Sequence, residues 1–96
     1  MKLEFQPAAR QELASAMQWY LDDGGVQVAE QFEHALARAV QLLTQLPKIG
    51  TPGAHDTRHW PLKRFPYTLV YRVRGKLISV VAVAHQSRAP SYWQGR

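Results

Sequence analysis

Five side chains in the second half of the chain have the types that RNA cleavage without a metal would require. Such cleavage needs a base near neutral pKa, a cation that stabilises a charged phosphorane, and an acid that protonates the leaving oxygen. His85 would serve as base or acid, and Arg64 would stabilise the phosphorane. Arg58 and Arg88 would hold phosphates, with Tyr92 as a further proton donor. Whether these groups meet depends on the elements that carry them.

Positive charge is concentrated in the same half of the chain. Residues 1–50 hold four Lys or Arg against six Asp or Glu, a net charge of −2, whereas residues 51–96 hold eight against one, a net charge of +7. Clustered Lys and Arg attract polyanions or acidic protein surfaces. The basic residues expected near strand ends, and hence on a binding surface, are Arg58, Lys63, Arg64 and Arg88.

Two histidines near a Gly/Pro-rich loop, His55 and His59, are the only pair that suggests a metal site. They lack a nearby third ligand, and the chain has no cysteine that would supply a thiolate. We therefore expect no metal and no other cofactor. The absence of cysteine also excludes a cysteine nucleophile and disulfide bonds.

Aromatic pairs occur at two places in the chain. Trp19 and Tyr20 lie near the end of a helical pattern and are expected to pack in the core or at the helix end. Tyr92 and Trp93 follow Pro90 in a short tail, where they either cap the sheet or bind a target or partner. Capping is the favoured interpretation, because an exposed Trp without a partner would be a liability.

Length and composition predict a single domain over residues 1–96, of which 46% is hydrophobic. The longest apolar run, residues 77–84, is far shorter than the ~20 residues that a membrane helix needs. A charged N-terminus does not fit a signal peptide. The expected location is the cytoplasm, without a membrane partner.

The first half predicts a strand followed by two helices. Leu3 and Phe5 alternate with polar residues, which is typical of a strand with one buried side. Apolar residues then recur at helical spacing over residues 8–21 and again over residues 28–46. Asp22-Asp23-Gly24-Gly25 separates the two patterns and predicts a loop. Two helices joined by so short a loop should form an antiparallel hairpin.

The second half has the two-residue period of strands. Residues 57–62, 67–73 and 77–84 predict a three-stranded antiparallel meander, with the last strand in the sheet interior because both its faces are apolar. Residues 50–53 predict a loop before it, and a short tail follows Pro90. The expected fold is α+β, in which the N-terminal strand and the meander form one sheet beside the helix hairpin.

The order of motifs resembles the RelE/ParE superfamily of toxins from type II toxin–antitoxin systems, and the ParE-like members more closely. The matching residues of the first half are Pro7-Ala8-Ala9, Trp19-Tyr20, Leu46-Pro47, Gly50 and Pro52. The matching blocks of the second half are Arg64-Phe65-Pro66-Tyr67-x-Leu69-Val70-Tyr71 and Val81-Ala82-Val83-Ala84-His85-x-x-Arg88-x-Pro90-x-Tyr92-Trp93. The resemblance covers nearly the whole chain.

The resemblance implies a growth inhibitor, of the kind linked to plasmid stabilisation, that forms a hetero-oligomer with a cognate antitoxin. RelE-like members cut mRNA on the ribosome, whereas ParE-like members inhibit DNA gyrase. Within the ribonuclease reading, the resemblance places Arg64 and His85 at positions that some members use in catalysis. The basic and aromatic residues Arg58, Lys63, Arg88, Tyr92 and Trp93 would then contact the target or the antitoxin.

The sequence departs from the ribonuclease members. It lacks the glutamate base or lysine pair that they commonly place in the middle of the chain, because no glutamate follows Glu33 and Lys63 is the only lysine near Arg64. Tyr92 lies seven residues beyond His85, whereas those members place a tyrosine close behind the last strand. Gyrase inhibition is therefore favoured. A metal-independent ribonuclease and a non-toxic member that only binds antitoxin are the alternatives.

Overall fold

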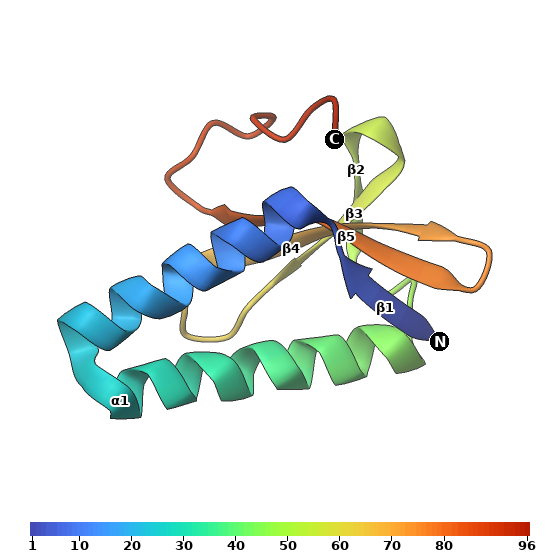
Figure 1. Cartoon of the computed structure of the whole chain (residues 1–96). Coiled ribbons are helices and arrows are strands. Elements are labelled where there is room, and N and C mark those ends of the chain that lie inside the picture. The colour runs from blue at the N-terminus through green and yellow to red at the C-terminus, as the bar shows by residue number, and fades with distance from the viewer.

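The computed structural model describes residues 1–96 and contains one α-helix, a short 3-10 helix (Ala54–Asp56) and five strands in one sheet (Figure 1). The strands are β1 (Lys2–Phe5), β2 (Thr51–Gly53), β3 (Thr57–Pro61), β4 (Tyr67–Arg74) and β5 (Leu77–His85). Their order across the sheet is β1-β5-β4-β3-β2. β1 is parallel to β5, and every other neighbouring pair is antiparallel. The α+β class, the N-terminal strand and the antiparallel meander are confirmed.

The β2 strand corrects the prediction of a loop after Gly50. Its three residues pair with Thr57–His59 of β3 and form the edge of the sheet opposite β1. An edge position suits Pro52, which has no N–H to donate to a second neighbour. The Gly and Pro residues that predicted a loop are therefore compatible with a short edge strand.

The prediction of two helices joined by a loop is wrong. A single element, α1 (Pro7–Gln45), includes the segment predicted as a loop, and only Gly25 leaves helical geometry, with φ 81° and ψ −178°. The chain turns back at this residue, which divides α1 into an N-terminal and a C-terminal arm (Figure 1). The rings of Tyr20 and Phe32 lie 5.0 Å apart, whereas a straight helix would separate these residues by about 18 Å. One glycine conformation thus replaces the predicted loop.

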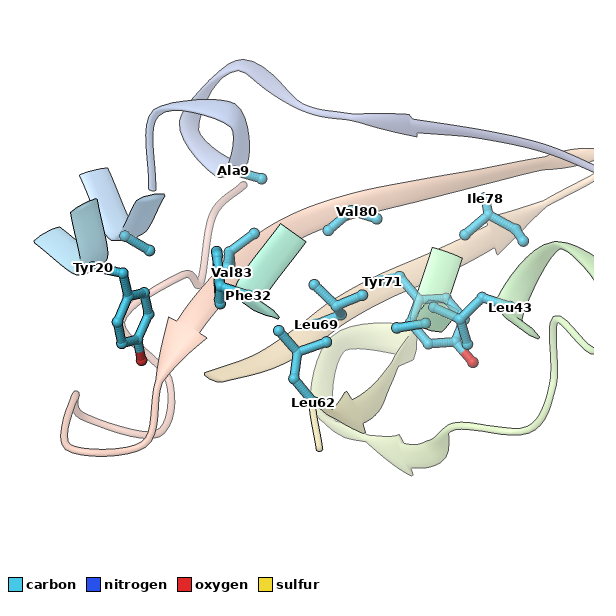
Figure 2. Close-up of a cluster of buried hydrophobic side chains, with 12 residues drawn as sticks. Ala9, Tyr20, Phe32, Leu43, Leu62, Leu69, Tyr71, Ile78, Val80 and Val83 are labelled. Carbon is cyan, nitrogen blue, oxygen red and sulfur yellow. The ribbon is translucent and has the colours of Figure 1, made fainter. Parts of the chain in front are cut away.

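Both arms of α1 pack against the same face of the sheet. The buried side chains of this core, most of them labelled in Figure 2, are Ala9, Ala16, Tyr20, Phe32, Ala39, Leu43, Leu62, Leu69, Tyr71, Ile78, Val80 and Val83. Small alanines on the helix allow close approach to the larger side chains of β4 and β5. Since only one stripe of each arm is apolar, α1 lacks the continuous hydrophobic stretch that spanning a bilayer requires.

The opposite face of the sheet is covered by the C-terminal tail, which forms a third layer. Trp93 is 2% exposed and packs on Val70, Val81 and Ala82. Its ring also meets His59 edge-on, at 5.7 Å between centroids. The expected folding back of Trp93 as a cap over the sheet is confirmed. Trp93 therefore belongs to the structural core of this face.

A β-bulge in β5 determines which side chains face the helix. Val70 pairs with Ala82 and Tyr71 pairs with Val80, which leaves Val81 without a partner on β4. Val80 packs in the helix-side core, whereas Val81 and Ala82 pack in the tail-side core. The extra residue inverts the alternation beyond this point. Residues at the end of β5 therefore face the opposite way from the one that simple alternation predicts.

The Gly25 geometry yields the first test. With φ near +80° and ψ near 180°, Gly25 occupies a region that is essentially restricted to glycine. We expect Gly25→Ala to lower the free energy of unfolding by about 1 to 3 kcal/mol, a fall in Tm of roughly 5 °C or more, measured by thermal denaturation.

A Cβ at Gly25 would meet no atom within 4 Å, so the loss reports the backbone conformation and not a clash. Gln27→Ala is the matched control, because Gln27 is exposed and helical two residues away. Equal stability of the two variants would contradict this role of Gly25.

Candidate functional site

A groove lies between the C-terminal arm of α1 and β3, and we call it the α1–β3 groove. It has a volume of about 620 Å³. Six of its twelve lining residues are hydrophobic: Ala35, Ala39, Leu42, Trp60, Leu62 and Phe65. Arg38, Lys63 and Arg64 also line it, and no acidic residue does. An apolar floor with cations at its margin suits an amphipathic acidic segment better than a polar small molecule.

Lys63 and Arg64 reach the α1–β3 groove from the tight turn between β3 and β4. The turn is closed by the N–H of Leu62, which donates to the carbonyl of Tyr67 at 2.9 Å. Arg64 has φ 70°, an uncommon conformation for a residue with a side chain. Both basic side chains are exposed. Among the predicted site residues, they share this exposure with Arg88.

His85 ends β5 at the same end of the sheet but belongs to a different hollow. The bulge places it on the face of Tyr67, whose ring it meets perpendicularly at 5.0 Å. Its Nδ1 accepts a hydrogen bond from the N–H of Ser87 at 3.0 Å. This assigns the proton of the neutral ring to Nε2. His85 lines a pocket of about 230 Å³ under the C-terminal tail, whereas Arg64 lines the α1–β3 groove.

Tyr92 and Arg88 lie over that smaller pocket, and the phenol of Tyr92 is already committed. Its O–H donates to Glu12 Oε2 at 2.7 Å. Burial, the hydrogen bond to Glu12 and the charge of Glu12 raise the pKa of Tyr92 to about 12. The guanidinium of Arg88 lies 3.9 Å from the centre of the Tyr92 ring. Tyr92 is thus a poor proton donor, and Arg88 is exposed but held by a cation–π contact.

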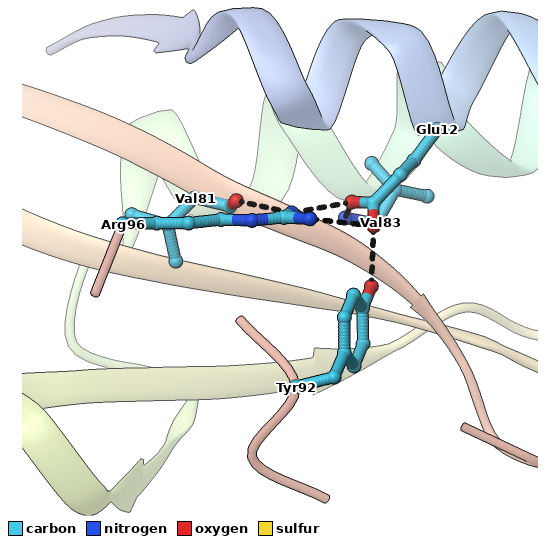
Figure 3. Close-up of polar contacts among 5 residues, drawn as sticks. All are labelled: Glu12, Val81, Val83, Tyr92 and Arg96. Atoms are coloured by element: carbon cyan, nitrogen blue, oxygen red, sulfur yellow. Dashed lines mark hydrogen bonds and ion pairs between the residues drawn. The ribbon is translucent and has the colours of Figure 1, made fainter. Parts of the chain in front are cut away.

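The carboxylate of Glu12, on the N-terminal arm of α1, joins three parts of the fold (Figure 3). It accepts hydrogen bonds from Tyr92, from the N–H of Val83 at 3.0 Å, and from both terminal nitrogens of Arg96 at 2.9 and 3.2 Å. Arg96 also donates to the carbonyl of Val81 at 3.1 Å. Burial alone would raise the pKa of Glu12, but the hydrogen bonds from Arg96, Tyr92 and Val83 lower it below 4.5.

Arg58 has a structural role in this fold. Its guanidinium donates to the carbonyls of Lys48 and Gly50, both at 2.9 Å. The hydroxyl of Tyr71 donates to the carbonyl of Pro47 and accepts from the N–H of Gly50. Together these bonds fix the connection between α1 and β2. The contacts of Arg58 therefore point inward.

The predicted site residues divide into two groups. Lys63, Arg64 and Arg88 are exposed at one end of the sheet, while Arg58, Tyr92 and Trp93 are used within the fold. No group of three metal-ligating side chains lies together. The arrangement provides a basic, partly apolar surface. It does not place Arg64 and His85 in one hollow with a proton donor.

Two residues that build this region were missed by sequence reasoning. Glu12 lies on the polar side of the first helical pattern and gives no local signal, because its partners are more than 70 residues away. In the sequence, Arg38 has the pattern of an ordinary exposed helix residue. The only feature that distinguishes it is that no other Lys or Arg occurs between Arg10 and Lys48.

Comparison with known proteins matches this chain to one family. The family model described as ParE toxin of type II toxin–antitoxin system, parDE, matches residues 3–90. A solved chain of the chromosomal ParDE toxin–antitoxin system from P. aeruginosa is 23% identical, with a TM-score of 0.76. The match covers 88% of this chain and 95% of that chain, and it supports the fold. No curated protein matches.

The Glu12 contacts predict a pH-dependent contribution to stability. Glu12→Gln should lower the free energy of unfolding at neutral pH by about 2 kcal/mol, since it removes charge-assisted bonds to Arg96 and Tyr92. Because the folded pKa of Glu12 is lowered, this stability is present above the unfolded pKa and is lost as pH falls through the folded value. Urea unfolding between pH 7 and pH 3 should therefore show the two proteins converging at the acidic end.

The exposed acid Glu4 on β1 supplies the matched control, and Glu4→Gln should match the wild type throughout. A difference between wild type and Glu12→Gln that stays constant with pH would contradict the assigned role of the Glu12 charge.

Proposed function

Because the chain belongs to the ParE toxin family of type II toxin–antitoxin systems, we propose that it arrests bacterial growth in the cytoplasm by binding and inhibiting DNA gyrase. A cognate antitoxin, bound in a hetero-oligomer, neutralises it. The family match supports the toxin class. The binding mechanism is our proposal from the geometry, and the gyrase target is our proposal from the resemblance to ParE-like toxins.

One observation carries the choice of a binding mechanism over RNA cleavage: the groups that cleavage would need do not surround one reacting position. Arg64 and His85 line different hollows. The hydroxyl of Tyr92 is bonded to Glu12, and the guanidinium of Arg58 to the chain before β2. Acid, base and phosphate-binding groups act only when they converge on the same atoms. A surface that binds and blocks a protein does not require such convergence.

The α1–β3 groove is the proposed site for the antitoxin. Its apolar floor fits the hydrophobic side of an amphipathic segment, and Arg38, Lys63 and Arg64 complement acidic residues on the opposite side. Arg88, which is exposed beside the smaller pocket, adds a further positive charge outside the groove. Charge of one sign along the groove also accelerates capture of an acidic partner.

Gyrase inhibition is tested with purified proteins and with cells. We expect expression without the antitoxin to arrest growth, and the purified toxin to inhibit supercoiling by gyrase in a dose-dependent manner. Primer extension on translated mRNA should show no toxin-dependent cuts. Unaltered supercoiling at saturating toxin would contradict the gyrase target, and cuts inside codons that vanish in Arg64→Ala and His85→Ala would favour the ribonuclease. Normal growth would leave only an antitoxin-binding module.

The antitoxin site predicts a salt-dependent association rate. Lys63→Ala combined with Arg64→Ala should slow antitoxin association about tenfold at low salt, because charges at the margin of an interface act mainly on the association rate. The dependence of this rate on salt, measured by stopped flow, should also weaken.

The control is Lys2→Ala combined with Lys76→Ala, which removes the same charge from exposed positions outside the groove. An identical effect of the two double variants would show that only net charge matters and would remove the groove from the proposal.

A further inference from the structure

The turn of α1 exposes large apolar side chains that the fold does not use. We call this region the α1 tip and define it as Trp19, Leu21, Asp22, Asp23 and Val26, which flank Gly25. Trp19 is 58% exposed, Leu21 40% and Val26 62%. Of the two predicted aromatic residues, Tyr20 packs in the core, whereas Trp19 lies outside it and packs at the helix end against Tyr20. Figure 1 shows the tip projecting beyond the strands at one end of the molecule.

The α1 tip is held rigidly by aromatic packing beneath it. The Tyr20 ring packs against both Phe32 and Phe65, at centroid distances of 5.0 and 5.1 Å, and lies 6.3 Å from Tyr67. Trp19 packs edge-on against Tyr20 at 5.2 Å. An aromatic side chain displayed on a fixed base binds without a large ordering cost. The tip thus has the properties of a preorganised anchor.

The charge around the α1 tip is opposite to that of the rest of the protein. Between Arg10 and Arg38 the chain has no Lys or Arg. The acidic residues of this segment that remain exposed are Asp22, Asp23, Glu30 and Glu33. The whole chain nevertheless carries a net charge of +5. The tip is therefore an acidic, apolar-centred surface on a basic protein.

We propose that the α1 tip is the surface through which this toxin binds its target, and that its partner is a basic, DNA-binding surface of the target protein. The inference rests on the proposed function, namely inhibition by binding. An enzyme that handles DNA must present basic residues to phosphates, and these complement the acids beside Trp19. The same acids repel DNA itself and the acidic antitoxin proposed for the α1–β3 groove. Target and antitoxin are thereby assigned to surfaces of opposite charge.

Two double variants test the α1 tip. One is Trp19→Ala with Val26→Ser, which removes the apolar anchor, and the other is Asp22→Lys with Asp23→Lys, which inverts the charge. Each should raise the toxin concentration that half-inhibits gyrase supercoiling by roughly tenfold or more. Each should also relieve growth arrest, while antitoxin affinity stays within about twofold in calorimetry and circular dichroism reports an intact fold.

Matched controls come from exposed residues away from the tip. Leu46 is 52% exposed and Glu4 is an exposed acid. Leu46→Ala and Glu4→Lys should leave supercoiling inhibition, growth arrest and antitoxin affinity unchanged. Full inhibition by both tip variants, or a loss of antitoxin binding in them, would overturn the inference. Self-association of the wild type that Trp19→Ala abolishes, seen by sedimentation, would assign the tip to a second copy and overturn it as well.

The design separates failure of the inference from failure of the proposed function. If the wild type arrests growth but leaves gyrase unaffected, gyrase is the wrong target, and the growth assay alone decides whether the tip variants have lost activity. If the wild type inhibits gyrase and the tip variants do so equally, only the inference fails. A wild type that does neither overturns both.

Discussion

The hydrogen bonds of the Glu12 carboxylate connect the three layers of the fold. The carboxylate lies on the helix layer, accepts the N–H of Val83 in the sheet, and holds Tyr92 and Arg96 of the tail. The pairing of β1 with β5 ends at Val80, whose carbonyl accepts a hydrogen bond from the N–H of Gln6. Beyond Val80, this edge of β5 would therefore leave backbone N–H and C=O groups without a partner. Glu12 and Arg96 bond to those groups in place of a longer strand. A partly buried ion pair is stabilising when its remaining hydrogen-bonding groups are satisfied in this way.

The bulge at Val81 then determines which side chain the ring of His85 packs against. Strict alternation from Val80 would turn the side chain of His85 toward the C-terminal tail. The bulge turns it toward Tyr67 on the other face. His85 still lines the pocket that Arg88 and Tyr92 line, but its ring packs against Tyr67, and the hydroxyl of Tyr92 is bonded to Glu12. Arg64 and His85 consequently do not share one hollow with a free proton donor.

Sequence patterns predicted the elements well wherever one period persisted over many residues. The strands around Leu69 and Val80 and the two apolar stripes of α1 follow directly from such periods. The continuity of α1 through Gly25 could not be predicted in this way, because paired Asp and Gly residues usually end a helix. The side chains on either side, Tyr20 and Phe32, stabilise the turn through tertiary contact. Local propensity contains no information about such contacts.

For the candidate site too, local sequence patterns identified the residue types, whereas their contacts with distant residues could not be predicted. The sequence identified the basic residues at the sheet end, but it did not predict which groups they contact or how far they are buried. Arg58 bonds to backbone carbonyls eight and ten residues away, and Trp93 is buried, whereas Trp19 is exposed. A count of charge over half the chain also conceals the acidic segment at the α1 tip. The groove and the tip carry opposite charge and share the aromatic base around Phe65, and this difference in charge is the basis on which we assign them to two different partners.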